Sequence, residues 1–434
     1  MAGGGGGGAL WVGALVGGGI LTGIAYGLEA AGVHAPEALL ATLLAAGGLA
    51  VVFGSCEAMI QAVENLGRIL GWNHFVAGTI AGVASNIPEV VMVGFVVAKE
   101  PRVAFVVVLL TIHVGALAFG VYSGLLPRDA RGLARLPAPL TQLSTDLYAC
   151  ASGVFCAMGG LMLVLKVTDA GDARGEGLLA GDLLALGAAL LLVFAVNIVR
   201  LVKRFSGATD AGESAEGVPP ASEGEPRAEG AEPEAGGGAA PASAPDAAPA
   251  GRWSKVLGYG ALGVAASVLG GHAVGEFADA LVKALTARGY SEMIGALLLS
   301  VFACAGVFIM IATAHAKGLY DIAIANVSGA VTQQPFLVLP VTLILMAVFA
   351  QVGVIEPLPH GGILAIDFET TSVVFFAFPV LLMLWKSVND DGRVNWLETA
   401  SMIALFGLVI FFLAEHGPPA NGVPLPGPGG AAGD

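Results

Sequence analysis

Long apolar runs dominate this chain and restrict what it can fold into. A stretch of about 20 predominantly apolar residues is long enough to cross a bilayer as an α-helix. Eleven such stretches are present: residues 9–30, 37–66, 74–98, 101–126, 143–167, 177–203, 254–285, 289–316, 319–350, 367–387 and 394–415. Only 12% of the residues are charged, whereas soluble domains have about 25%. The sequence therefore predicts an all-α membrane protein with about eleven transmembrane helices.

One long polar segment divides the apolar runs. Residues 206–252 are rich in Ala, Gly, Pro and Glu and contain almost no large apolar side chain. Such a segment cannot bury enough surface to fold, so we expect a disordered acidic linker. We expect residues 1–36 to contain an extra N-terminal helix, and residues 37–205 and 253–416 to form two halves of five helices each. Residues 417–434 should be a disordered tail.

The positive charges predict how the chain is oriented. Lys and Arg are more frequent in the loops on the same side as the central linker than in the loops on the opposite side. The positive-inside rule then places the N-terminus and the linker in the cytoplasm. The N-terminus carries no basic residue before its apolar run, which argues against a cleaved signal peptide. We expect a multi-pass protein of the cell membrane.

One carboxylate lies in the middle of an apolar run. Glu89 follows Asn86, Ile87 and Pro88 within residues 74–98. A carboxylate at this depth costs at least ~2.5–3.5 kcal/mol, and such residues usually bind or move an ion. Pro88 removes a backbone donor and loosens the helix, which leaves carbonyl oxygens free to face a cation. We interpret Glu89 as the centre of a cation or proton site. The alternative is a protonated carboxyl group that is hydrogen-bonded inside the helix bundle.

A pattern of polar residues occurs in two of the predicted helices. The residues are Glu57, Gln61 and Glu64 in the first half, and His272, Glu276 and Asp279 in the second. Both sets follow i, i+4, i+7, which places each set on one stripe of a helix. Five helices per half is an odd number, so the second half should be inverted relative to the first. Inverted repeats with a site near the bilayer midplane are common in secondary transporters. Chance similarity between two amphipathic helices is the alternative.

Two ordered motifs resemble the α-repeats of the calcium/cation antiporter superfamily, which contains sodium/calcium and calcium/proton exchangers. The first half contains Gly54-Ser55-Cys56-Glu57 and then Ser85-Asn86-Ile87-Pro88-Glu89. The second half contains the stretch from Asp321 through Asn326 to Thr332-Gln333-Gln334-Pro335. The resemblance covers most of residues 37–416. It implies two inverted five-helix repeats, preceded here by one N-terminal helix, and exchange of cations at a site between the halves.

The resemblance implies which side chains form the site. The candidates for cation or proton binding are Glu89, Asn86 and Ser85 from the first half and Asn326, Thr332, Gln333 and Gln334 from the second. The candidates for an access path or proton relay are Glu57, His113, His272, Glu276 and Asp321. Glu89 is the expected metal ligand. Each histidine has an alternative role as a hydrogen-bonded core group, since imidazole is common in both roles.

The chain departs from the family at the second carboxylate. In the family each half supplies one acidic residue at the centre. The corresponding position here falls near Gly306-Val307, where no acidic residue is present, and Val103 to His113 lacks the matching Asp and Asn. A divalent cation usually requires two or more carboxylates, whereas one carboxylate with amide and hydroxyl oxygens suits a monovalent cation or a proton better.

These observations favour a transporter and not an enzyme, because no catalytic motif such as His-Glu-x-x-His is present. We predict a secondary active antiporter that exchanges sodium or calcium for protons or sodium by alternating access at Glu89. The missing carboxylate motivates the alternative, a transport-inactive membrane scaffold or regulatory subunit. The expected partners are the transported cations and the lipid bilayer. We expect no cofactor and no nucleic acid, and we make no prediction of oligomeric state.

Overall fold

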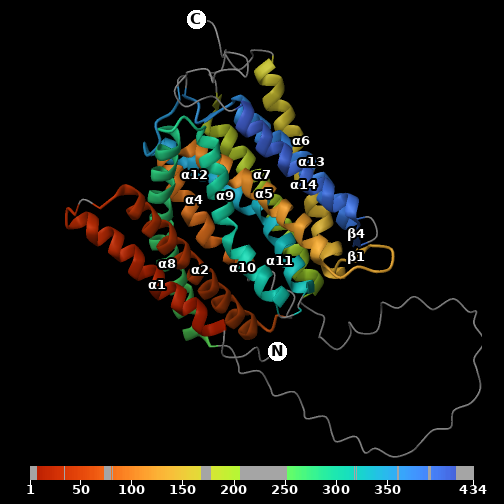
Figure 1. The fold of residues 1–434 in the computed structure, drawn as a ribbon. Coiled ribbons are helices and arrows are strands. Elements are labelled where there is room, and N and C mark those ends of the chain that lie inside the picture. Colours follow the sequence, from red (N-terminus) through yellow and green to blue (C-terminus); the bar gives the residue numbers. More distant parts are fainter. Residues whose placement is uncertain are drawn as a thin grey trace, which may run out of the picture.

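The computed structural model describes residues 7–33, 35–72, 80, 82–167, 177–205, 252–316, 318, 320–358, 361–389 and 392–416. These residues form a bundle of long helices (Figure 1). The helices of the first half and its N-terminal addition are α1 (Gly7–Ala30), α2 (Glu37–Leu70), α4 (Ile87–Lys99), α5 (Pro101–Leu125), α6 (Ala138–Val167) and α7 (Ala180–Phe205). Those of the second half are α8 (Trp253–Thr286), α9 (Glu292–Ala303), α10 (Ala305–Ala316), α11 (Tyr320–Gln333), the π-helical turn η1 (Gln334–Val338), α12 (Leu339–Gln351), α13 (Phe368–Asn389) and α14 (Trp396–His416).

The helices account for the predicted membrane spans. In the described part of the chain, ten helices are long and apolar enough to cross a membrane. The remaining predicted span, residues 289–316, is interrupted at Cys304 and forms α9 and α10, each of 12 residues. The prediction of an all-α membrane protein with about eleven transmembrane helices is confirmed. The predicted disordered linker and tail lie outside the described residues, apart from residue 252.

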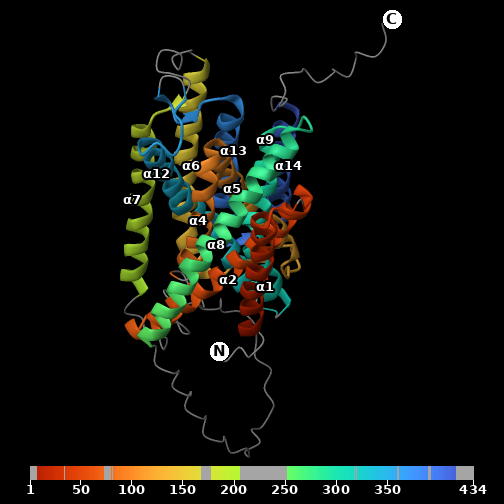
Figure 2. The same ribbon diagram turned by 90° about the vertical axis from the view of Figure 1, so that its left-hand side faces the viewer.

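The bundle has two ends, which we name by the helices that begin or end there. We call the end at which α7 stops and α8 starts the linker end, and the end at which α14 stops the far end (Figure 2). Two short antiparallel strand pairs connect loops of the two halves. Strand β1 (Ala134–Arg135) pairs with β4 (Arg393–Val394) at the linker end, and β2 (Gly177–Leu178) pairs with β3 (Leu364–Ala365) at the far end. Each half is therefore joined to the other at both ends.

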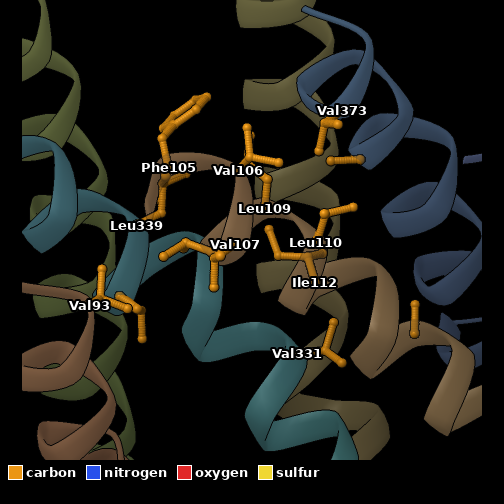
Figure 3. Packing of buried hydrophobic residues seen from close by; sticks show 14 of the residues in the cluster. Val93, Phe105, Val106, Val107, Leu109, Leu110, Ile112, Val331, Leu339 and Val373 are labelled. Atoms are coloured by element: carbon orange, nitrogen blue, oxygen red, sulfur yellow. The ribbon is translucent and has the colours of Figure 1, made fainter. Parts of the chain in front are cut away.

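Helix α5 lies in the interior of the bundle. Its residues are apolar on every face, which is the pattern of a fully buried helix, and 18 of its 25 residues are buried. Val106, Val107 and Leu110 of α5 pack near Leu339 of α12 and Val373 of α13 (Figure 3). The site helix α4 and the second-half helices α11 and α12 surround this core.

Helices α2 and α8 pack against each other and relate the two halves by inversion. The hydroxyl of Ser55 donates to the carbonyl oxygen of Gly263 and lies 2.7 Å from the hydroxyl of Ser267. Gly48 in turn packs against Gly270, so early residues of α2 meet late residues of α8 and the helices are antiparallel. If the polar stripes that begin at Glu57 and His272 are aligned, the Gly48–Gly270 contact corresponds to the Ser55–Gly263 contact. A two-fold axis between the helices requires this correspondence.

The helices that follow are both interrupted. The helical turn 82–85 stops at Asn86 before α4 begins, and α9 stops at Cys304 before α10 begins. Asn86 and Cys304 have almost the same backbone conformation, with φ/ψ of −83°/−10° and −77°/−3°. Glu89 lies three residues after the first break and Val307 lies three residues after the second. If the two halves are aligned at these breaks, Val307 corresponds to Glu89.

Candidate functional site

Glu89 lies in the first turn of α4, immediately after the break in the helix. Pro88 precedes it and is favoured early in a helix, because its missing N–H group would have no intrahelical partner there. A carboxylate in the first turn also interacts favourably with the helix dipole. The side chain of Glu89 is only half buried, although it lies beside the packed interior of the bundle.

The second half meets this carboxylate through Gln334. The amide nitrogen Nε2 of Gln334 donates to both carboxylate oxygens of Glu89, each at 2.9 Å. Gln334 is 3% exposed and is the first residue of η1. Pro335 follows it and cannot donate a backbone hydrogen bond, which accounts for the local change from α- to π-helix. Such π-helical turns often occur at functional sites.

A second bridge between the halves lies one turn away. The amide nitrogen Nδ2 of Asn86 donates to the amide oxygen Oε1 of Gln333, and both side chains are buried. Four of the predicted site residues are therefore in contact in two pairs, Glu89 with Gln334 and Asn86 with Gln333. Each pair joins the break of α4 to the junction of α11 with η1.

The other predicted ligands are not part of these pairs. The hydroxyl of Ser85 donates to the carbonyl oxygen of Gly82 at 2.7 Å, within its own helical turn. The hydroxyl of Thr332 donates in the same way to the carbonyl oxygens of Ser328 and Gly329. Asn326 is half buried, and no hydrogen bond within the described part of the chain connects it to Glu89. These residues lie close in sequence to the site, but their polar groups have other positions or partners.

Two of the predicted access residues lie between α8 and α4, toward the far end. His272 stacks on Tyr26 of α1, with ring centroids 5.7 Å apart, and contacts Phe95 of α4 at 5.3 Å. One turn further, Glu276 forms an ion pair with Lys99 at the end of α4, at 2.6 Å between Oε1 and Nζ. The α8 stripe therefore follows α4 from the middle of the bundle to its far end.

The remaining access candidates are dispersed. Glu57 is half buried on α2, next to Cys56, whose thiol donates to the carbonyl oxygen of Ser85. His113 is buried in α5, and its Nδ1 is bonded to the carbonyl oxygen of its own helix. Asp321 is exposed in the first turn of α11, at the linker end. Among these three, only Glu57 is adjacent in sequence to a residue, Cys56, that contacts the turn before α4.

The sequence analysis did not identify two cysteines near Glu89. Cys56 and Cys304 are both close enough to interact electrostatically with the Glu89 carboxylate. Their positions in the sequence could have indicated them, because Cys56 is adjacent to Glu57 and Cys304 occupies the break in the second half.

A cluster of charges at the far end was also not predicted. Arg102 at the start of α5 forms ion pairs with Glu292 of α9 and Glu369 of α13, and with Asp367 at 2.7 Å. Ser291 donates a further hydrogen bond to Glu369, at 3.1 Å. Glu369 is only 2% exposed. The guanidinium group joins three elements of the bundle.

Comparison with known proteins agrees with this fold. The structure resembles the H+/Ca2+ exchanger CAX with a TM-score of 0.58 and 12% identity, over 92% of this chain and 87% of that chain. It resembles native YfkE with a TM-score of 0.55 and 14% identity, over 93% of this chain and 99% of that chain. In addition, residues 255–414 match the sodium/calcium exchanger protein family model. The family match covers little more than a third of the chain, and the two solved structures share its fold. No curated protein matches this chain.

Proposed function

We propose that this protein is a secondary active cation antiporter whose transport site is centred on Glu89. The observation that carries the proposal is the pair of hydrogen bonds from Gln334 to both oxygens of Glu89. They join an intramembrane carboxylate of residues 37–205 to a polar residue of residues 253–416. A site at the junction of inverted halves is where secondary transporters bind their substrates. The match of residues 255–414 to the sodium/calcium exchanger protein family model supports the same function.

The proposed exchange follows from competition for one negative charge. A cation and a proton both neutralise the Glu89 carboxylate, so binding of one disfavours binding of the other. We propose sodium or calcium as the cation and protons or sodium as the counter-ion. Alternating access would come from rocking of helices around the site. The antiparallel α2–α8 pair is suited to this movement because it contacts α4 on one side and α1 on the other. The positive-inside rule supports a cytoplasmic linker end.

Flux in proteoliposomes tests the proposal. When a pH gradient is imposed, the native chain should exchange sodium or calcium for protons. Glu89→Gln should reduce this flux by more than about tenfold, and a tenfold change in rate corresponds to about 1.4 kcal/mol of activation free energy. Glu64→Gln is a matched control, since Glu64 is a half-buried carboxylate near the linker end that pairs with Arg68 at 3.5 Å. The control should retain most of the native flux. Equal flux in the native protein and Glu89→Gln would contradict the assignment of the site.

One observation favours the alternative of a transport-inactive scaffold or regulatory subunit. Val307 occupies the position that corresponds to Glu89, so the symmetric centre has a carboxylate from one half only. The same flux experiment separates the two functions. If the correctly folded native protein moves neither sodium nor calcium under any imposed pH gradient, the scaffold function is favoured over antiport.

A further inference from the structure

We propose that Gln334 determines the ion specificity of the Glu89 site, and that it exchanges its amide nitrogen for its amide oxygen when a cation binds. The inference rests on the proposed function, because it assigns a ligand and a substrate class to the same site. The substrate class is a monovalent cation such as sodium. The argument depends on the position of the two amide atoms.

The amide nitrogen lies where a cation would bind. Nε2 of Gln334 is 2.9 Å from each oxygen of Glu89 and is therefore equidistant from them. A cation bound by both oxygens of a carboxylate lies on the same bisector, at about 2.3–2.6 Å for calcium. The nitrogen and the cation cannot both occupy this position. The amide must leave the carboxylate before a cation can bind to both oxygens.

The amide oxygen of Gln334 has no partner. Gln334 is 3% exposed, and Oε1 lies fully buried with no hydrogen-bond donor in reach among the described residues. A buried polar atom without a partner is unfavourable. Amide oxygens are common ligands of hard cations. Rotation about the terminal side-chain torsion, which is broad and nearly two-fold, exchanges the nitrogen and the oxygen, and rotation about the preceding side-chain torsions withdraws the amide to make room for the cation. The rotated side chain would present Oε1 to the cation.

The neighbouring amide is fixed in a different way. Oε1 of Gln333 accepts from Asn86, so this side chain is already used in a bridge to the first half. Gln333 and Gln334 are consecutive, chemically identical and both buried, but only Gln334 contacts the carboxylate. Gln333 therefore provides a matched control for every substitution of Gln334.

The charge of the site follows from this assignment. A glutamine supplies a ligand oxygen without adding charge, so the pair Glu89 and Gln334 carries a single negative charge. One charge balances one monovalent cation, whereas a divalent cation usually requires two or more carboxylates to offset dehydration. Gln334→Glu has nearly the same shape and adds the second carboxylate. This substitution should change the preference from sodium to calcium.

Thermal unfolding of the purified full-length chain in detergent tests the inference. Sodium chloride and calcium chloride are titrated at constant ionic strength, because a ligand that binds only the folded state raises the unfolding temperature. We expect sodium to stabilise the native protein more than calcium. Gln334→Glu should lower the apparent Kd for calcium at least about tenfold, and Gln334→Leu should raise the apparent Kd for sodium at least about tenfold. Gln333→Glu should not produce the change to calcium.

Infrared difference spectra provide a readout that a purely structural role would not affect. Addition of sodium should shift a carbonyl band of a glutamine side chain, and this band should be absent in Gln334→Leu but present in Gln333→Leu. The inference is overturned if the band persists in Gln334→Leu, if calcium stabilises the native protein as strongly as sodium, or if Gln334→Glu leaves the ion preference unchanged. If Glu89→Gln abolishes the response to cations but the Gln334 variants do not alter it, antiport at Glu89 stands and the role of Gln334 is rejected. If neither cation stabilises the native protein and flux is absent, the proposed function itself fails.

Discussion

At the scale of single residues, Asn86 connects a local break to the contact between the halves. Asn86 occupies the N-cap of α4, but its side chain forms no capping hydrogen bond. A cap side chain normally accepts from the N–H of the second or third helical residue. Here the second residue is Pro88, which has no N–H group. The side chain of Asn86 instead donates across the interface to Gln333.

We predict that Asn86 and Gln333 are energetically coupled. Asn86→Ala and Gln333→Ala should each destabilise the protein, because each leaves a buried amide without its partner. The double variant should cost less than the sum of the two, with a coupling energy of about 0.5–1.5 kcal/mol, as for other hydrogen bonds between membrane helices. Reversible unfolding of the four proteins in a double-mutant cycle measures this quantity. Additive effects would show that the bridge contributes no coupling.

The site was predictable at this scale only in part. The depth of Glu89 and the order of the motifs were sufficient to select Asn86, Gln333 and Gln334 as its neighbours, and the structure brings these four residues into two contacts. Consecutive residues of an α-helix point about 100° apart, yet both glutamines contact the break of α4. The helix changes to a π-helical turn at Gln334, and periodicity in the sequence does not reveal such a turn. The partners of Thr332 could not be predicted for a similar reason, because its hydroxyl can bond within its own helix.

At the scale of elements, the contact of α4 with α8 includes an ion pair at the far end. Lys99 ends the helix that begins with the site, and Glu276 lies on the polar stripe of α8. Both side chains are about one-third exposed, so the pair contributes little to stability, about 0–1 kcal/mol. Its effect should be on relative movement of the two helices, because the pair must separate if α8 rocks away from α4.

We predict that either single charge reversal changes the rate of cation flux, and that reversing both charges together restores it. Lys99→Glu places two carboxylates in contact, and Glu276→Lys places two ammonium groups in contact. Each single variant should change the initial rate of cation flux in proteoliposomes, while the unfolding temperature changes little. The combination Lys99→Glu/Glu276→Lys should return the rate toward the native value. If the double variant differs from the native protein more than either single variant, the ion pair does not act between these helices.

At the scale of the whole molecule, the inversion of the halves depends on how closely α2 and α8 approach. The number of spans and the inversion were predictable from the length of the apolar runs and from the repeated polar stripes. The pairing of α2 with α8 was not, because small residues at an interface do not specify their partner. Gly48 and Gly270 meet where a side chain has no space. Gly258, on the same helix α8, has open space around it, so the two positions separate the effect of close packing from that of helix propensity.

We predict opposite results for alanine at these two positions of α8. In Gly270→Ala the new methyl group would lie 2.9 Å from Cγ2 of Val52 and 3.0 Å from the carbonyl oxygen of Gly48. The helices would have to separate, at a cost of about 1–3 kcal/mol, which is typical of overpacking. Gly258→Ala should leave stability unchanged or raise it by up to about 1 kcal/mol, since alanine favours the helix. Unfolding temperature and cation flux should both fall in Gly270→Ala only. If both variants unfold like the native protein, the α2–α8 contact is looser than the structure shows. Close packing of α2 against α8 is then not required to keep Glu89 in contact with the second half.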